Sequence, residues 1–299
     1  MTALALPLSF GLCLLLPWVI PSGVFGADAP APPATQPPRL NIADRAACSS
    51  LVRCKQSTDD ALRVVSAMGF KWVDLACLNW APHVSVPRLM EDFEKEAGRV
   101  EAALKGNGLR VANLTFDGPD VRPFDQYERE FAAVVKVAAR FKARLINIMA
   151  PSAKADRDEM VRRLRKLQAA ASQAGVLLTI ETHCDQLTER PADALWLCRQ
   201  VPGLGLTLDP SHYFAGPNQG ANFDALYPFV QGTGFRAGGM SWKEIQRPWG
   251  KGPIDFAAVA RKLESAGYRG FYVAEYIEGF NELDAEHESG RFLDWAKQL

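Results

Sequence analysis

The sequence predicts a (β/α)8 barrel, and three observations support this fold class. Short apolar runs alternate with helix-length amphipathic segments about eight times over roughly 250 residues, as such a barrel requires. The apolar runs at 176–180 and 204–208 each end in a carboxylate, Glu181 or Asp209, where parallel βα units carry their functional groups. No GxGxxG motif follows the first strand, which counts against a dinucleotide-binding sheet.

Two segments are expected to precede the barrel. Residues 1–26 hold a short apolar run followed by small residues, which is typical of a secretory signal peptide cleaved before Ala27. No Lys or Arg precedes this run, so a membrane anchor is the alternative. Residues 27–44 are rich in Pro and Ala and predict a linker, which assigns the barrel to 45–299. The mature protein is therefore expected to be exported, periplasmic or secreted, without stable membrane association.

The elements of the first half follow from hydrophobic periodicity and from end signals. A weak strand is expected within 45–52, and Ser57 and Gly69 delimit the helix that follows it. The pattern then predicts strands at 70–77, 109–116 and 143–151, and helices at 87–106, 123–143 and 156–175.

The second half repeats the same order. The strands at 176–180 and 204–208 flank a helix at 191–201 that Pro191 opens. The remaining pattern predicts a short helix or turn at 221–230, a Gly-rich strand at 230–236, a helix at 254–267, a strand at 267–277 with Glu275 near its end, and a closing helix at 290–299.

Composition and cysteine count exclude some classes of protein. The formal net charge is zero, which argues against a nucleic-acid partner, since such binders carry a basic excess. Once residues 1–26 are removed, five cysteines remain, so at least one thiol is unpaired within a chain. Cys48 and Cys54 are close enough in sequence to pair, and we expect one or two bridges at most.

Carboxylates end three different strands, and this convergence is the main sign of a functional site. Glu181, Asp209 and Glu275 would meet at one mouth of the barrel and repel each other unless a cationic group lies among them. A divalent metal ion is the economical answer, and oxygen ligands favour Mn or Mg over a thiolate zinc site. The alternative is that Glu181 and Asp209 cap helices or turns. The histidines that follow them, His183 and His212, favour the site.

These residues resemble the xylose-isomerase-like TIM-barrel superfamily, the sugar phosphate isomerase/epimerase group, over about residues 45–299. That pattern has a Glu on the fifth strand, Asp-x-x-His on the sixth, a His or Gln on the seventh and a Glu on the eighth. The corresponding stretches here are IETH, LDPSH, FVQGTGFR and VAEY. The resemblance implies one divalent ion (Mn, Mg, Co or Zn) held by Glu181, Asp209, Gln231 and Glu275. Gln231 in place of histidine resembles the dehydratase branch.

The resemblance also implies roles for the residues of the site. Glu181 and Glu275 would act as acid and base on a proton next to a carbonyl, and a bound metal would stabilise the enediolate. His183 and His212 would hydrogen-bond substrate oxygens or carry protons. Three further residues are expected to bind substrate, although each could equally be a packing or surface residue: Arg236, Trp80 and His83.

The first interpretation is therefore a metal-dependent isomerase or epimerase of a small-molecule sugar or keto-polyol. A dehydratase or lyase of a keto-sugar or cyclic keto-polyol, such as inosose or dehydroshikimate, is the alternative. A third possibility is an inactive barrel that binds carbohydrate. AP-endonuclease chemistry, which needs several zinc ions, is disfavoured by the presence of only four histidines. Association into a homo-oligomer is left open.

Overall fold

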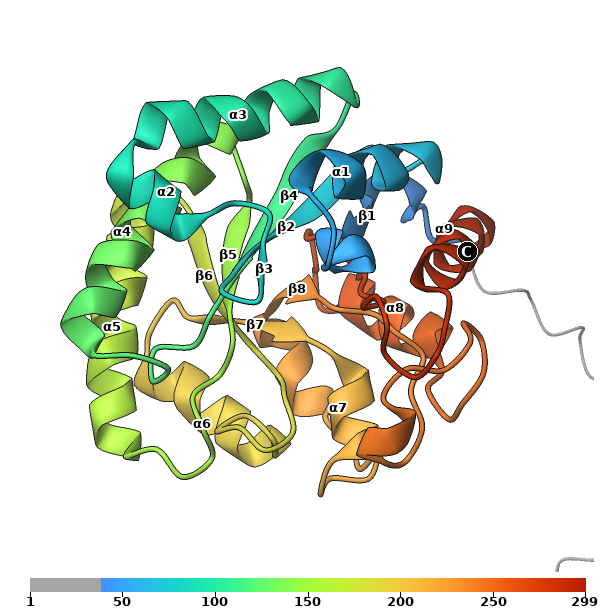
Figure 1. Cartoon of the computed structure of the whole chain (residues 1–299). Helices are drawn as coiled ribbons and strands as arrows, with labels where there is room; N and C mark the ends of the chain where they lie inside the picture. Colours follow the sequence, from blue (N-terminus) through green and yellow to red (C-terminus); the bar gives the residue numbers. More distant parts are fainter. Residues whose placement is uncertain (1–38) are drawn as a thin grey trace, which may run out of the picture. The chain divides into compact units, whose positions relative to one another are not determined.

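Eight parallel strands form a nearly closed barrel with helices around its outside (Figure 1). The computed structural model describes residues 39–299. Around the barrel the strands follow the order β8-β7-β6-β5-β4-β2-β1-β9, and the two-residue strand β3 pairs antiparallel with β2. The predicted (β/α)8 fold class is thus confirmed.

Strands and helices alternate along the chain from β1 to α9. The barrel strands are β1 (Ala46–Ser49), β2 (Trp72–Leu78), β4 (Arg110–Phe116), β5 (Leu145–Ile148), β6 (Leu177–Glu181), β7 (Gly205–Leu208), β8 (Val230–Thr233) and β9 (Tyr272–Ala274), and β3 is Ala81–Pro82. The α-helices are α1 (Thr58–Ala67), α2 (Val86–Glu91), α3 (Phe93–Gly106), α4 (Phe124–Phe141), α5 (Arg157–Gln173), α6 (Pro191–Gln200), α7 (Pro210–Ala215), α8 (Phe256–Ser265) and α9 (Ala285–Gln298). The 3-10 helices are η1 (Ala43–Arg45), η2 (Ser50–Arg53), η3 (Asp224–Phe229) and η4 (Trp242–Glu244).

Most predicted elements are present, and two differences have local causes. The helix expected at 87–106 is two helices, because Asp92 takes an extended conformation (φ −148°) and its side chain accepts a hydrogen bond from the Lys95 backbone. The closing helix begins earlier than residue 290, since Asp284 caps it by accepting from the amides of Glu286 and His287. Such an N-cap is easily missed in a sequence when the residues that follow it are polar.

The start of the barrel also differs from the sequence-based boundary. The expected signal peptide, residues 1–26, and most of the expected linker lie outside the described residues. Residues 39–44 of that linker belong to the packed unit, in which Ile42 is fully buried. The backbone N–H of Leu40 donates to the carbonyl of Leu299, which ties this segment to the C-terminal end of α9. Among residues 39–299, no helix has the length and apolar character needed to cross a bilayer.

The barrel interior is polar at the level just below the site. Outward-facing strand residues such as Ile146, Leu178 and Leu206 pack under the helices in the main core. Inward-facing residues include Asn147 and Thr179, and the Thr179 hydroxyl lies 2.8 Å from that of Thr207. Because inward positions repeat every second residue, Glu181 and Asp209 follow these threonines at the C-terminal mouth.

The barrel closes between β8 and β9 through a short seam. A single parallel bridge joins Phe235 to Ala274 beyond the end of β8. The Phe235 amide donates to the carbonyl of Val273 (2.7 Å), and the Glu275 amide donates to the carbonyl of Phe235 (3.0 Å). This seam places the residues after β8 directly beside Glu275.

Candidate functional site

A pocket of about 230 Å³ opens at the C-terminal mouth of the barrel. Its deep end is lined by charged and polar groups, and its walls are apolar, with Leu51, Leu78 and Met149 among them. Trp80, Trp242 and Phe280 lie at the pocket with 54%, 50% and 39% of their surfaces exposed. The volume lies just below the ~300–1,000 Å³ typical of small-molecule sites, so the pocket suits a compact ligand.

Glu181 and Asp209 both point into this mouth and are both buried. The backbone after Glu181 is fixed because Thr188 donates its hydroxyl to the Glu181 carbonyl (2.5 Å). The two oxygens of Asp209 have different partners. Its Oδ1 caps α7 by accepting from the Ser211 amide (2.8 Å), and its Oδ2 forms an ion pair with Arg236. The helix-capping alternative was therefore correct for one oxygen of Asp209, and the site interpretation is supported by the other.

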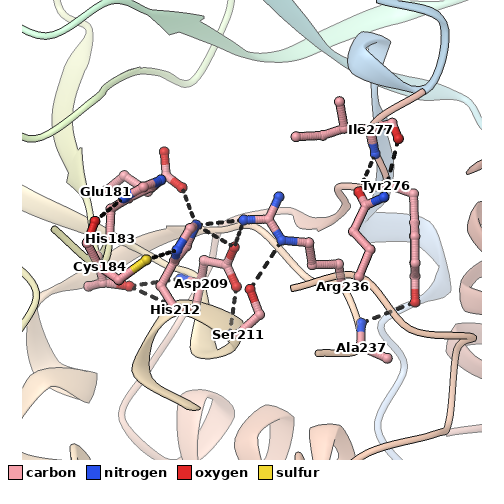
Figure 2. A network of polar contacts seen from close by, with 12 residues as sticks. Glu181, His183, Cys184, Asp209, Ser211, His212, Arg236, Ala237, Tyr276 and Ile277 are labelled. Carbon is pink, nitrogen blue, oxygen red and sulfur yellow. Dashed lines mark hydrogen bonds and ion pairs between the residues drawn. The ribbon is translucent and has the colours of Figure 1, made fainter. Parts of the chain in front are cut away.

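The guanidinium of Arg236 lies beside Asp209, Ser211 and His212 (Figure 2). Arg236 is only 3% exposed, and its Nη2 lies 2.8 Å from Asp209 Oδ2 and 2.5 Å from His212 Nε2. Its Nε donates to the hydroxyl of Ser211 (3.1 Å). Burial alone would lower the pKa of Arg236, but the charges of Asp209, Glu275 and Glu181 hold that pKa above its ordinary value. The predicted involvement of Arg236 in the site is thus supported, at a more central place than expected.

The two histidines stack on each other, with ring centroids 3.7 Å apart. The guanidinium has no lone pair to give, so His212 Nε2 accepts from Arg236 and the proton of the neutral ring is on Nδ1. That Nδ1 lies 3.2 Å from the sulfur of Cys184, to which it donates. Burial, with the nearby charge of Arg236, holds the pKa of His212 well below its usual range.

His183 is likewise neutral at physiological pH. Burial lowers its pKa to about 4, although its ring donates to a backbone carbonyl, which partly opposes the change. Its Nδ1 lies 2.5 Å from the Cys184 carbonyl, which can only accept a hydrogen bond. The proton of the neutral ring is therefore on Nδ1, and Nε2 is free to act as an acceptor. Since His183 lines the pocket, it is available to accept a hydrogen bond from a ligand hydroxyl.

Glu181 and Glu275 are the two carboxyl groups that the pocket exposes to a ligand. Burial, then the charges of Glu275 and Asp209, raise the pKa of Glu181 well above its ordinary value. Burial also raises the pKa of Glu275 to about 8, with Arg236 opposing the rise and Asp209 adding to it. The two groups influence one another and titrate together, so the cluster holds a proton near neutral pH.

Gln231 does not lie at this mouth, and its assignment as a metal ligand is corrected. Its Oε1 accepts from Arg144, which stands at the N-terminal end of β5. The register of β8 against β7 shifts between Leu206 and Thr207, and the Gly234 amide donates to the Leu208 carbonyl. The residue that faces the mouth here is therefore Gly234, which directly follows β8. A Cβ there would lie 2.0 Å from Glu275 Oε2 and 3.8 Å from Asp209 Cβ.

Of two further residues predicted to line the pocket, the structure places one there and the other elsewhere. Trp80 lines the pocket, as expected. His83 does not: it is buried beside η2, with Nδ1 2.8 Å from the Ser50 hydroxyl and Nε2 3.2 Å from the Arg53 carbonyl. Its predicted place in the wall of the pocket is corrected, because β3 folds back on β2 and turns His83 toward that 3-10 helix.

Cys48 and Cys54, whose separation in sequence would allow a disulfide, are not bonded to each other. All five cysteines of the described chain are buried free thiols: Cys48, Cys54, Cys77, Cys184 and Cys198. Cys48 packs in the main core under the helices, whereas Cys54 belongs to a separate apolar cluster with Leu51 and Ala76. Short separation in sequence thus does not bring these two sulfurs together.

Sequence reasoning missed part of the pocket. Trp242 lies 5.9 Å from His212 between ring centroids, and Cys184 orients the same histidine through Nδ1. Thr115, Ile245 and Ile277 complete the lining. Trp242 lies in a loop without a periodic pattern, so a single sequence offers no signal for it. Cys184 follows His183 directly and was considered only for disulfide bonding.

Whether the residues present fit a divalent ion can be tested on their contacts. Glu181, Asp209 and His212 offer one donor atom each, all within 4.8 Å of one another, and two carboxylates with an imidazole are chemically suited to a metal. The same Asp209 oxygen and the same His212 nitrogen, however, contact the guanidinium of Arg236. The seventh strand of the barrel contributes Gly234 where a fourth ligand would project. As they stand, these residues do not fit a divalent ion.

Comparison with solved structures finds the same fold in several proteins. A probable 3-DHS dehydratase, AsbF, from Bacillus anthracis is 18% identical with a TM-score of 0.66, covering 84% of this chain and 97% of its own. D-allulose 3-epimerase from Methylomonas sp. is 16% identical with a TM-score of 0.65, covering 85% and 97%. A xylose isomerase-like TIM barrel protein from Mycobacterium smegmatis, in complex with magnesium, is 17% identical with a TM-score of 0.63, covering 80% and 88%. At these identities the likeness shows the fold alone.

No curated protein matches the chain. A family model does match, over residues 62–299, and its description is xylose isomerase-like TIM barrel. The match spans most of the described barrel, from α1 to the C-terminus, and includes every residue placed in the pocket except Leu51. The chain therefore belongs to the xylose isomerase-like TIM barrel family.

Proposed function

We propose that this protein is an enzyme that moves a proton at the carbon next to the carbonyl of a small sugar or keto-polyol, as an isomerase or epimerase does. The observation that carries the proposal is the pair Glu181 and Glu275 in one pocket with the buried cation Arg236 beside them. Solved barrels of the same fold include a D-allulose 3-epimerase and a probable dehydratase, which supports sugar or polyol chemistry at this kind of mouth.

The two carboxyl groups supply base and acid. Mutual repulsion and burial favour a state in which one is ionised and the other protonated, which is the state that proton transfer requires. The ionised carboxylate removes the proton from the carbon next to the carbonyl, and the carbonyl becomes an enolate oxygen. The protonated partner returns a proton to the opposite face of the same carbon, giving an epimer. Alternatively, the proton of the adjacent hydroxyl moves to the enolate oxygen and the former carbonyl carbon is protonated, so that the hydroxyl oxygen becomes the new carbonyl and an isomer forms.

The other pocket residues bind and orient the ligand. His183 offers an Nε2 acceptor to a hydroxyl, as argued from its contact with the Cys184 carbonyl. Trp80 and Trp242 present aromatic surface at the pocket, suited to the apolar C–H face of a sugar ring. As they stand, the residues of the site do not fit the divalent ion expected from the sequence, and no step of this mechanism depends on that ion.

The test is solvent exchange of the substrate proton in deuterated water, followed by NMR on D-fructose and D-allulose. Wild-type protein is expected to wash deuterium into the carbon next to the carbonyl and to form the epimer. Glu181→Gln and Glu275→Gln should each slow exchange by about 10²–10⁴-fold, since each removes a group that transfers the proton. Exchange with unchanged rates in both variants would contradict the proposal.

The dehydratase interpretation and the inactive barrel are separate outcomes of the same experiment. The dehydratase argument rested on Gln231, which lies at the other end of β8 and no longer supports it. Loss of a hydroxyl with formation of an unsaturated product from a cyclic keto-polyol would restore it. Binding of sugar with no exchange on any substrate would instead support a carbohydrate-binding barrel.

We further propose, from the sequence of residues 1–26, that the protein is exported. The substrate would then be a free or oxidised sugar, because sugar phosphates are metabolites of the cytosol. N-terminal sequencing of the protein from its native host should give Ala27 as the first residue. An intact Met1 in the mature protein would contradict export by cleavage.

A further inference from the structure

The mouth of the barrel holds three buried or half-buried carboxyl groups and one guanidinium. Glu181 and Asp209 are 3% and 0% exposed, and Glu275 lines the same pocket. Carboxylates in such surroundings require a nearby positive charge, since an isolated buried charge is strongly disfavoured. Arg236 supplies that charge from within the chain, at 3% exposure and 2.8 Å from Asp209.

The contacts of Arg236 use the atoms that a metal ion would need. A neutral imidazole nitrogen has one lone pair, and that of His212 Nε2 points to Arg236 Nη2 at 2.5 Å. Asp209 Oδ1 accepts from the Ser211 amide, and its Oδ2 forms an ion pair with Arg236 Nη2 at 2.8 Å. A divalent ion would therefore compete with the guanidinium for the lone pair of His212 Nε2, would have to share Asp209 Oδ2 with it, and would be repelled by its charge.

The position of Arg236 is built into the backbone. Ser211 accepts from its Nε, and Ser211 belongs to α7, the helix that Asp209 caps. On the other side, the hydroxyl of Tyr276 accepts from the amide of Ala237, next in the chain. Gly234 lies two residues before Arg236 and directly after β8. Because it has no side chain, Glu275 can occupy the space where a Cβ at this position would lie. Figure 2 shows Arg236 with Asp209, Ser211 and His212, and the contact of Ala237 with Tyr276.

We infer that Arg236 is the resident cation of this site, in the place that a divalent metal would otherwise take. In the reaction proposed above, on which this role rests, the guanidinium balances the charge of the carboxylates and donates to the enolate oxygen as it forms. A fixed donor in a buried site needs no reorganisation when that charge develops, which is the basis of oxyanion stabilisation. Activity then requires no added ion.

Metal binding tests the inference independently of activity. Wild-type protein, stripped with EDTA and then titrated with Mn²⁺ by calorimetry, is expected to show no specific site. Arg236→Met removes the charge and the donors while keeping a long side chain, and should bind one Mn²⁺ per chain at least ~100-fold more tightly than wild type, because a repelling charge is gone. Arg236→Lys retains a cation and should bind no more tightly than wild type.

A double variant fixes the location of the new ion. Arg236→Met with Asp209→Asn should lose the Mn²⁺ gained by Arg236→Met alone, since one donor is removed. Arg99→Met is the matched control for loss of a partly buried guanidinium elsewhere, where Arg99 contacts Glu96, and should not bind Mn²⁺ at the site. Thermal unfolding of each variant checks that it is folded.

The outcomes separate this inference from the proposed function. One Mn²⁺ per wild-type chain, lost in Asp209→Asn, would overturn the role of Arg236, and this measurement needs no folded Arg236 variant. Wild-type exchange activity that persists in EDTA and falls in Arg236→Lys supports it. If no sugar undergoes exchange, the proposed function fails, while the Mn²⁺ titrations still decide which cation the site holds.

Discussion

Gly234 determines how closely Glu275 can approach the other charged groups. A Cβ at this position would lie 2.0 Å from Glu275 Oε2, closer than any real contact, and the nearby Asp209 limits where that side chain can go. The atom in conflict is the end of a flexible side chain, so the backbone has no need to move. The residue is thus expected to matter for the site far more than for folding.

Gly234→Ala should therefore lower proton-exchange activity by about 10-fold or more, because small displacements of a reacting group are costly. The free energy of unfolding should change by less than about 1 kcal/mol, as is usual when no core contact is lost. Both are measured on the same preparation, by deuterium exchange and by urea unfolding. Gly98→Ala in α3 adds the same methyl in open space and should leave activity unchanged. Equal activity in both variants would contradict this role.

Asp74 is a buried carboxyl group whose surroundings should make the stability of the protein depend on pH. It lies inside the barrel on β2, 6% exposed, with one carboxyl oxygen accepting from the Thr115 hydroxyl (3.0 Å). Within residues 39–299 its other oxygen has no hydrogen-bond partner. Burial raises the pKa of Asp74 to about 6, against the hydrogen bonds that favour the charged form.

The sign of the pH effect follows from this direction. The folded state holds the proton of Asp74 more tightly than the unfolded state, so stability from this group is greatest at low pH. It is lost as the pH rises between the ordinary value of 3.8 and about 6. Asp74→Asn cannot lose a proton and should gain about 2 kcal/mol relative to wild type between pH 4 and pH 7.

Urea unfolding of both proteins at a series of pH values measures that difference. Asp125→Asn, whose side chain is 76% exposed, is the control and should differ from wild type by a constant amount. A difference between Asp74→Asn and wild type that does not vary with pH would show that the carboxyl group is already ionised, or already protonated, across the whole range.

At the residue scale, sequence reasoning succeeded where a functional residue ends a regular strand. Glu181 and Asp209 end short apolar runs with clear alternation, so the side of the strand on which each carboxylate lies could be predicted from the sequence. It failed for Gln231, because the register shift between β7 and β8 decides which residue of that strand faces the mouth. Such a shift depends on pairing between strands and leaves no mark in the Gly-rich segment itself. Arg236 was found, but its depth depends on the same pairing.

At the element scale, the segment after β8 is held to the end of β9 by side chains. The buried hydroxyl of Tyr276 accepts from the Ala237 amide (3.0 Å) and donates to the Arg247 carbonyl (2.9 Å). Gln246 contacts the backbone of Ile277 and of Phe280. The loop between these points carries Trp242, which lines the pocket. The two segments therefore position one wall of the site together.

Tyr276→Phe should loosen this loop, because it leaves a buried amide and a carbonyl without partners. We expect a loss of about 1–3 kcal/mol in the free energy of unfolding and faster amide hydrogen exchange over 237–247. Tyr127→Phe removes an equally buried hydroxyl that donates to the Asp117 carbonyl, away from this loop. Exchange measured by mass spectrometry should rise over 237–247 only in the first variant. A rise in both, or in neither, would contradict the role of Tyr276.

The sequence reveals elements better than it reveals their interruptions. Strong periodicity located β2, β4, β6 and the helices α4 and α5 close to their observed bounds. The break at Asp92 was missed because the residues on both sides keep a helical pattern, and only the cap contact with Lys95 separates the two helices. The short helix α7 was also missed, since its six residues are too few to show a period.

At the scale of the whole molecule, the described fold depends on packing without covalent cross-links. Burial raises the pKa of the Cys48, Cys184 and Cys198 thiols to about 12, so they stay protonated and unreactive. Cys77 is also buried, and Cys54 donates to the Glu278 carbonyl. A barrel of this size has enough core to be stable without bridges.

Reduction should therefore leave the stability of the protein unchanged. The temperature of unfolding, measured by calorimetry, is expected to be the same with and without dithiothreitol, and the five thiols within residues 39–299 should react with a thiol reagent only after denaturation. A drop of several degrees on reduction would show that a disulfide contributes to the fold. Retention of structure with a fully reduced chain would agree with the buried thiols.

The alternation of strands and helices allowed the fold class to be predicted, but the N-terminal limit of the barrel depends on long-range contact. Ile42 is fully buried in the main core, and Leu40 bonds to the carbonyl of Leu299, more than 250 residues away in the chain. A Pro-rich stretch just before these residues gives a linker-like composition to a window that includes them. Because no local pattern marks the segment, only its partners show that it belongs to the fold.

Removal of this segment should destabilise the whole barrel, since it packs beside β1 and α9, where the chain closes. Ile42→Ala is expected to cost about 2–5 kcal/mol, as for other fully buried aliphatic residues. Val121→Ala, at 59% exposure, should change stability by no more than about 0.5 kcal/mol. A chain that begins at Ala46 should unfold at a markedly lower urea concentration than one that begins at Arg39. Equal midpoints for the two would mean that the contacts of Leu40 and Ile42 contribute nothing to the stability of the barrel.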